Sequence, residues 1–459
     1  MKYNIEDLIT EFSLDALRCS EYRINNGEAC VFFYLSPGNL TATSNQLPDI
    51  CAFVKEGSDL LNFNTAELFL DGNKIDCRKD AYCLSFKPTT ALAWGKHRAK
   101  ILVNGIDGIP LEFTWSFFIE NELEDYVFCY GIPHSHTSFS DGAGTPLDAY
   151  EKALNNGLNF LIITDHQGRL VNNSANYDKS ILISGSRHPK WEMLKLEAAF
   201  VNSKHKNFIA LCGFELSTKF WGHINIINSE NIIEKKPSDL KELYAWLCAE
   251  ENILLSINHP YRSPKTLPFS HNFDNFVNLY EVGNGSTTRM YNRAEQNYYK
   301  ALDDGWHIAA INGQDNHAED WGDSSNVTAV ICSTHSPEAL LDGIKLRRVY
   351  STESKALKLV VKFNNLWMGS IINLKPDDII KAHILAENKE TPISKIQIIS
   401  NGGKIIKERL FNNSAKCQWN FNLEVNEEYS WYVVKVIHED EKIGISSAVF
   451  IQSLNTTKL

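Results

Sequence analysis

The sequence predicts a multidomain α/β plus β protein, in which a central α/β barrel lies between two β-sandwich modules. Its length of 459 residues exceeds what one hydrophobic core usually organises, so two to four domains are expected. Both ends of the chain read as short strands separated by turn signals, whereas the middle alternates short apolar runs with helix-length amphipathic stretches. We therefore expect modules over residues 1–125, 126–352 and 353–459.

Composition limits the classes of protein that this chain can represent. Hydrophobic residues make up 43% and charged residues 22%, as in ordinary folded proteins, and the formal net charge is -11. An acidic chain is not held on extended nucleic acid or an anionic membrane by bulk electrostatics. The ten cysteines form no CxxC pair, and neither a signal peptide nor a run of ~18 apolar residues is present. We expect a cytoplasmic protein with free thiols and no membrane partner.

The first module reads as an immunoglobulin-like β-sandwich. Apolar strand candidates cover residues 29–34, 66–70 and 113–119, and turn signals follow the first two at 36–39 and 71–73. Regularly spaced short strands of this kind predict two packed sheets.

The central module reads as a series of strand and helix units. Residues 126–132 form a strand, Thr145 can cap a helix that begins at Pro146, Gly157 can end that helix, and 160–163 form the next strand. Further strand candidates lie at 208–211, 224–227, 253–257, 277–280, 308–311 and 327–330. Seven or eight strands that alternate with helices predict a parallel sheet closed into a barrel.

The last module shows the same pattern of short strands and turn signals as the first. Strand candidates lie at 357–363, 396–400 and 430–437, and Asn401-Gly402-Gly403 supplies a turn signal. The pattern predicts a second β-sandwich.

Histidines and carboxylates gather where the predicted central strands end. The nine candidates are His134, His136, Asp141, His166, Glu215, His223, His259, Asp315 and His317. One histidine in such a position is more often an ordinary polar residue, but His134 and His136 alternate on an extended segment and face the same way. Strand ends converge in α/β barrels, so we expect one cleft. Nine nitrogen and oxygen ligands suit two or three Zn, Mn or Fe ions.

In their order along the chain, these residues resemble the motifs of the polymerase and histidinol phosphatase (PHP) superfamily. The motifs are His134-Ser135-His136-Thr137 through Asp141-Gly142, Thr164-Asp165-His166, Gly213-Phe214-Glu215, Asn258-His259-Pro260 and Gly313-Gln314-Asp315-Asn316-His317. The resemblance covers about residues 126–352, and Gln314 stands where the family often has serine. The segment 347–352 also resembles the CehA/McbA-type metallohydrolase branch of this superfamily.

The resemblance implies a distorted (β/α)7 TIM-like barrel with a trinuclear metal site. It assigns the first metal to His134, His136, Glu215 and Asp315, the second to Glu215, His223 and His259, and the third to Asp141, His166 and His317. It further implies phosphoester hydrolysis by a metal-activated hydroxide.

The predicted function is therefore a metal-dependent phosphoric ester hydrolase that acts on a small phosphomonoester or nucleotide. Asp315, His317 and Arg262 are the candidate catalytic residues, and Arg169 is a second candidate for contacting a phosphate. Asp165 and Glu281 are candidates for orienting metal-bound histidines. Carbamate, carboxylic ester or amide hydrolysis remains an alternative, because the same chemistry attacks carbonyl carbon. A degenerate, non-enzymatic barrel that carries partner-binding β modules is the third reading.

Overall fold

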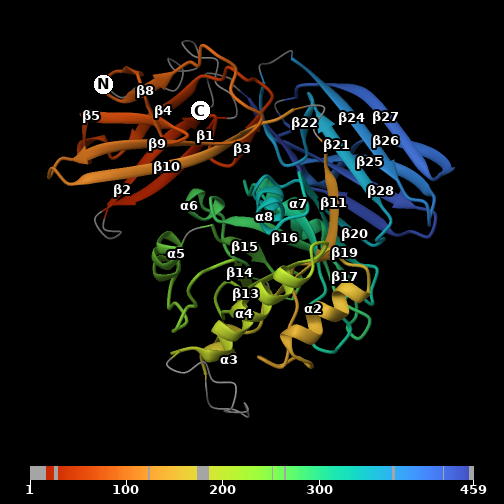
Figure 1. Cartoon of the computed structure of the whole chain (residues 1–459). Coiled ribbons are helices and arrows are strands. Elements are labelled where there is room, and N and C mark those ends of the chain that lie inside the picture. The colour runs from red at the N-terminus through yellow and green to blue at the C-terminus, as the bar shows by residue number, and fades with distance from the viewer. Residues whose placement is uncertain are drawn as a thin grey trace.

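The computed structural model describes residues 17–24, 29–121, 125–172, 186–250, 252–262, 265–374, 378–426 and 428–453. The extreme ends of the two predicted flanking modules, 1–16 and 454–459, lie outside these ranges. Two mostly β regions flank a central region that carries the helices (Figure 1). No helix within the described ranges is long and apolar enough to cross a membrane.

The first region consists of two five-stranded sheets packed face to face. One sheet has the order β1 (Arg18–Ile24), β2 (Ala29–Ser36), β4 (Ile50–Glu56), β8 (Cys83–Phe86) and β7 (Arg78–Lys79). The other has the order β3 (Thr41–Thr43), β10 (Pro110–Ile119), β9 (Gly95–Gly105), β5 (Leu61–Leu70) and β6 (Asn73–Ile75). Alternate side chains of both sheets, such as Phe33 and Trp115, fill one shared core, which is how a β-sandwich buries its inner faces.

The central region is a mixed sheet with helices on both of its faces. Its strands are β11 (Val127–Ile132), β12 (Phe160–Ile163), β13 (Ile209–Ser217), β14 (His223–Ile227), β15 (Leu254–Ile257), β16 (Val277–Asn284), β17 (Asn292–Arg293), β18 (Ala309–Gly313), β19 (Val327–Cys332) and β20 (Val349–Thr352). Its helices are α2 (Pro146–Asn155), α3 (Gln167–Val171), α4 (Pro189–Lys204), α5 (Leu240–Ala249), α6 (His271–Asp274), α7 (Glu295–Asp303) and α8 (Pro337–Lys345). Helix α8 packs against one face of the sheet, and other helices, such as α2, α4 and α5, pack against the opposite face.

The first helix of this region begins where the sequence indicates. Thr145 and Asp148 form a reciprocal capping box at the start of α2, with Pro146 at the first helical position. Gly157 follows the helix with φ of 76°, a left-handed conformation that glycine adopts without strain.

Strand direction departs from the predicted parallel sheet. The pairs β11–β12, β12–β13, β15–β16 and β16–β18 are parallel, but β14 is antiparallel to β13 and β15, and β19 is antiparallel to β11 and β20. For β13 and β14 the reason is connection length, because only residues 218–222 separate these two strands. A parallel pair needs a crossover of about a dozen residues or more.

A closed (β/α)7 barrel is not shown by the strand pairing. Among the described residues, no main-chain ladder joins β18 to β19. Side chains link the two strands instead: the Thr328 hydroxyl accepts from the Asn312 amide and donates to the Asn312 carbonyl, both at 3.0 Å. The Thr328 side chain, and not a main-chain ladder, thus links β18 to β19.

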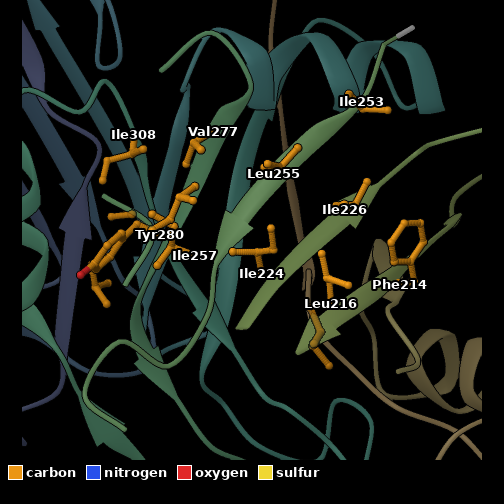
Figure 2. Packing of buried hydrophobic residues seen from close by; sticks show 14 of the residues in the cluster. Phe214, Leu216, Ile224, Ile226, Ile253, Leu255, Ile257, Val277, Tyr280 and Ile308 are labelled. Carbon is orange, nitrogen blue, oxygen red and sulfur yellow. The ribbon is translucent and has the colours of Figure 1, made fainter. Parts of the chain in front are cut away.

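The sheet separates two apolar cores. Cys129, Ile162, Leu279 and Ile311 belong to a cluster on one face, to which α8 adds Leu340. The opposite face packs against helices and includes Phe214, Leu216, Ile224, Ile226, Leu255 and Ile257 (Figure 2). Successive residues of a strand point to opposite faces of the sheet. The residues that alternate with Phe214, Leu216, Ile224 and Ile226 therefore point to the other face.

The last region has two β layers and shares one of them with the central sheet. One layer comprises β22 (Leu366–Trp367), β21 (Lys358–Phe363), β24 (Ile379–Glu387) and β27 (Lys416–Glu424). The other comprises β29 (Ile443–Ser446), β28 (Trp431–His438), β25 (Ile393–Ser400), β26 (Lys404–Ser414), β30 (Val449–Ser453) and β23 (Ile371–Leu374). Strand β29 pairs with β20, so this layer continues the central sheet. The domain boundaries expected from the sequence remain a prediction.

Buried ion pairs fasten the first region to the central one. Arg18 of β1 donates to the Asp274 carboxylate of α6 at 3.3 Å and to its main-chain carbonyl at 3.0 Å. Arg348, directly before β20, pairs with Glu120, directly after β10. Buried charged contacts thus join the first region to the central one.

Candidate metal centre

Strand alternation brings the predicted ligands to one face of the central sheet. Phe214 and Leu216 are fully buried in the outer core, so Glu215 between them points to the opposite face. On the neighbouring strand, Ile224 packs into the same outer core and His223 precedes it. In the antiparallel register Ser217 faces His223, and the side chains of Glu215 and His223 meet at 3.1 Å.

Main-chain hydrogen bonds hold the loops after the strands together. The Asp315 amide donates to the His134 carbonyl, and the His136 amide donates to the Asn316 carbonyl, both at 3.0 Å. His166 and Glu215 form an isolated parallel bridge. The ladder therefore continues past the strand ends, and the predicted ligand residues lie on a fixed backbone.

All nine residues predicted as ligands lie in three groups whose ligand atoms are within 4.8 Å of one another. The inner group is His134, His136 and Asp315; the bridging group is Glu215, His223 and His259; and the outer group is His136, Asp141, His166 and His317. Their role as metal ligands remains a prediction. What the structure provides is their convergence from five separate parts of the chain.

Glu215 occupies the centre of this arrangement. Its Oε1 atom lies 3.1 Å from His223 Nδ1, 3.3 Å from His259 Nε2 and 3.5 Å from His134 Nε2. Its Oε2 atom lies 3.0 Å from His166 Nδ1. One carboxylate thus borders all three groups, as a bridging ligand must.

The inner part of the site is closed to solvent, whereas the outer part is open. His134 and His136 have fully buried side chains, while 25% of the His166 and His317 side chains and 43% of the Asp141 side chain are exposed. A small molecule from solvent would therefore meet the outer group first.

Glu281 and Asp165, the two predicted orienting residues, act in different ways. The Glu281 carboxylate lies 2.6 Å from His134 Nδ1 and also accepts the His259 amide at 2.5 Å. Asp165 accepts hydrogen bonds from Thr137 and Ser140, in the loop that joins His136 to Asp141. Glu281 thus orients a predicted ligand directly, and Asp165 fixes the loop between two of them.

Two arginines meet the site at Asp315. Arg262 Nη1 lies 3.0 Å from Asp315 Oδ2, and Arg289 Nη1 lies 2.9 Å from the same oxygen. About a third of each side chain is exposed. The sequence indicated Arg262 but not Arg289, which lies in the loop after β16 outside every recognised motif. Arg169 lies exposed on α3, three residues after His166.

Two predicted ligands have strained backbones. His259 has φ of 27° and Asp315 has φ of 50°, and residues with a side chain rarely adopt such positive values. Strain of this kind costs of order 1–3 kcal/mol and persists where the surrounding structure enforces it, often at functional sites. Here the Asp315 amide is bound by His134 and the His259 amide by Glu281.

The carboxylates create a negative potential inside the site. Burial opposes the charging of His134, but Glu281, Asp315 and Glu215 outweigh it and raise its pKa to about 9. Burial also opposes the charging of His166, yet Asp141 and Glu215 raise its pKa to about 10. Despite its burial, the nearby histidines hold the pKa of Glu215 well below its usual range. A potential that retains protons on imidazoles also attracts a metal cation.

The donor set fits divalent transition metals. Six imidazoles and three carboxylates suit Zn, Mn or Fe, while none of the ten cysteines belongs to the three groups. The His134 and His136 Nε2 atoms approach to 3.2 Å, and Asp315 Oδ1 lies 3.2 Å from the latter. Imidazole nitrogens aimed at one point beside a carboxylate are the geometry that a shared cation satisfies.

Comparisons with known proteins do not establish a family. No family model and no curated protein matches the sequence. Among solved structures, the chain is similar to a two-domain protein from Bacteroides vulgatus that contains a predicted PHP-like metal-dependent phosphoesterase. Identity is 14%, the match covers 71% of this chain and 96% of that one, and the TM-score is 0.40.

Two further similarities are weaker. One is to SGBP-B of a mixed-linkage glucan utilization locus of Bacteroides ovatus, with 10% identity, a TM-score of 0.15 and coverage of 95% of this chain and 70% of that one. The other is to an FMN-binding β-glucuronidase from Facaelibacterium prausnitzii, with 9% identity, a TM-score of 0.17 and coverage of 96% and 74%. Similarities of this size do not identify the function of the chain.

Proposed function

We propose that this protein is a metal-dependent phosphoesterase that hydrolyses a small phosphomonoester or nucleotide. The observation that carries the proposal is the convergence of six histidines and three carboxylates in three groups, each compact enough to hold a cation. The order of the motifs, which resembles that of the PHP superfamily, supports the same chemistry.

The three groups correspond to three proposed cation positions. The inner group with Glu215 would hold one cation, the bridging group a second, and Asp141, His166 and His317 a third. Bound divalent cations would supply Lewis acidity and lower the pKa of water. The structure supports the ligand set, while the number and identity of the metals belong to the proposal.

Glu281 prepares His134 for this role. Its carboxylate holds the proton on Nδ1 of the neutral imidazole, so that Nε2 presents its lone pair toward His136 and Asp315. His317 is contacted on Nδ1 by both Arg289 Nη1 at 2.7 Å and the Asp315 carbonyl at 2.9 Å, and its Nε2 atom lies 3.3 Å from Asp141 Oδ1.

Arg262 and Arg289 would bind the anionic oxygens of the substrate. Each guanidinium uses one nitrogen on Asp315 and retains further N–H donors, and each is partly exposed. Guanidinium donors match phosphoryl oxygens in geometry and charge. Asp315 would thereby connect the inner ligand group to the two arginines that contact the phosphate. We propose this as its role in catalysis, together with His317.

The charge distribution favours a small substrate. The whole chain carries -11, so an extended nucleic acid would be repelled by most of the surface, whereas cations and two arginines would make the site locally positive. We include a cytoplasmic location in this proposal; the ten cysteines form no disulfide, which suits a reducing compartment.

Elemental analysis of the purified chain, combined with a phosphate-release screen, tests the proposal. We expect bound Zn, Mn or Fe and hydrolysis of p-nitrophenyl phosphate, both reduced at least tenfold in His136→Ala. The matched control is His271→Ala, which removes an exposed histidine on α6. Metal-free protein that retains full activity after chelation would exclude the metal-dependent mechanism.

The same assay separates the alternative reactions. Turnover of naphthyl acetate or a carbamate without phosphate release would favour carbonyl hydrolysis of the CehA/McbA type. A metal-loaded protein that hydrolyses none of these substrates would favour a binding module, provided that its biological activity is unchanged in the double variant His134→Ala/His136→Ala.

A further inference from the structure

Arg289, which lies outside every recognised motif, reaches the metal centre from the loop between β16 and β17. The loop starts at Gly285, whose amide donates to the Gly313 carbonyl at 3.0 Å, and it ends where β17 pairs with β16. Inside it, the Ser286 amide donates to the Arg289 carbonyl at 3.1 Å, so the chain reverses tightly over residues 286–289. This turn has to be held against the rest of the site before Arg289 can occupy a fixed position.

Asp320 binds the tip of this loop. The residue is buried, with 3% of its surface exposed, and its Oδ2 atom accepts three hydrogen bonds. The donors are the Thr287 hydroxyl at 3.0 Å, the Thr288 hydroxyl at 2.8 Å and the Thr288 amide at 3.2 Å. Hydrogen bonds to a charged acceptor are roughly twice as strong as neutral ones, so this carboxylate fixes the two residues that precede Arg289.

The second oxygen of Asp320 binds the segment that carries two predicted ligands. Its Oδ1 atom accepts from Asn316 Nδ2 at 2.7 Å, and Asn316 lies between Asp315 and His317. Asn316 is itself fully buried. One buried carboxylate therefore ties the loop that carries Arg289 to the segment that carries the ligands.

The two connections give the Arg289 guanidinium a fixed place. Its Nη1 atom lies 2.9 Å from Asp315 Oδ2, 2.9 Å from the Asp315 carbonyl and 2.7 Å from His317 Nδ1. Among the described residues, Nη2 and Nε of Arg289 find no hydrogen-bond partner, and 34% of the side chain is exposed. These nitrogens retain donors for a phosphoryl oxygen.

Order in the free protein strengthens the binding of an anion. A long side chain on an unanchored loop loses conformational freedom when it closes on a ligand, and that loss weakens binding. Because Asp320 already holds the tip of the loop, Arg289 loses less freedom when a phosphate binds. A misplacement of about 1 Å at such a contact can lower a rate about 100-fold.

We propose that Asp320 is a positioning residue, which holds the loop of residues 286–289 so that Arg289 is ready to bind a phosphoryl oxygen. Asp320 itself would touch neither the substrate nor a metal. The inference rests on the phosphoesterase proposed above, but the binding of phosphate by Arg289 requires no hydrolysis and can be measured separately.

Calorimetric binding of inorganic phosphate to the metal-loaded full chain tests the proposal, together with the kinetics of p-nitrophenyl phosphate hydrolysis. We expect Asp320→Asn to weaken phosphate binding and to raise KM by at least about fivefold, with a smaller change in kcat and an unchanged metal content. The control is Asp323→Asn, which removes a partly exposed carboxylate of the same segment that pairs with Lys152. This variant should bind phosphate as the unmodified chain does.

A double-mutant cycle shows whether Asp320 acts through Arg289. Arg289→Ala should weaken phosphate binding by at least about tenfold, and Asp320→Asn/Arg289→Ala should bind no more weakly than Arg289→Ala alone. Effects that multiply in the double variant would overturn the positioning role. An Asp320→Asn protein that binds phosphate normally, or that loses its metal, would overturn it as well.

Exposed positions offer a second way to release the loop without changing a buried residue. Thr287→Val/Thr288→Val removes both hydroxyl donors to Asp320 and should weaken phosphate binding by at least about threefold. Unaltered binding by this variant would contradict the proposal. A metal-loaded, unmodified protein that binds phosphate but hydrolyses no ester would overturn the proposed function alone, whereas one that binds no phosphate would overturn the present inference.

Discussion

Glu281 Oε1 lies 2.6 Å from Nδ1 of His134, and both side chains are fully buried. The contact joins the end of β16 to the segment that follows β11, two parts of the chain 147 residues apart. It also raises the pKa of His134, together with Asp315 and Glu215 and against the effect of burial. A carboxylate in this position controls which nitrogen of the imidazole faces the predicted metals.

Glu281→Gln should therefore weaken metal binding without removing a predicted ligand. The amide has lost the negative charge that holds the Nδ1 proton, so we expect metal affinity to fall about 10–100-fold. Competition with a chromogenic chelator measures the change. Glu319→Gln, an exposed position next to the site, is the control and should bind metal as the unmodified chain does.

Gly313→Ala should destabilise the protein. A Cβ atom at Gly313 would lie 1.8 Å from Glu281 Oε1, which forces the buried carboxylate away from His134. Overpacking of this kind costs about 1–3 kcal/mol in the free energy of unfolding. Thermal unfolding checks the effect against Gly168→Ala in α3, where nothing lies within 4 Å of the new methyl group. Equal melting temperatures would show that the Glu281 contact is not rigid.

Metal uptake by chelator-treated protein should release protons. The pKa is raised to about 9 for His134 and to about 10 for His166, so both imidazoles are largely protonated at neutral pH without metal. A cation must displace these protons, and its apparent affinity should therefore rise with pH up to about pH 10. Calorimetry in buffers of different ionisation enthalpy counts the protons. No proton release at pH 7 would contradict the arrangement of charges described for the site.

Asp274→Asn should loosen the first β region from the central one. Asp274 is buried, and although burial itself disfavours the carboxylate, His307 and Arg18 hold its pKa below the usual value. Its contribution to stability is thus fully present above about pH 4 and is lost as the pH falls through the lowered folded-state pKa. We expect the free energy of unfolding to fall by about 3–5 kcal/mol at pH 7, because Arg18 remains buried without its carboxylate partner.

The pH profile provides a second check on this contact. Thermal unfolding measured downward from pH 6 should show a shallower acid-induced decline in Asp274→Asn than in the unmodified chain. As the control, Asp304→Asn removes a half-exposed carboxylate that pairs with Lys300. It should leave both the stability at pH 7 and its decline at acid pH nearly unchanged.

The sequence by itself determined the local elements and the residue types of the site. Thr145, Pro146 and Gly157 bound α2 because capping and backbone freedom act within a few residues. The nine candidate ligands could be selected for a similar reason, since most of them lie at or shortly after the end of an apolar run that is buried as a strand, although His223 begins its strand.

Only the tertiary structure decided how these parts meet. The sheet shared by β20 and β29, the cluster formed by Arg289 with Asp315, and the ion pair of Glu120 with Arg348 all depend on contacts between distant segments. Local propensity does not specify such contacts, because they are fixed by packing, pairing register and the removal of charges from water once the whole chain has folded.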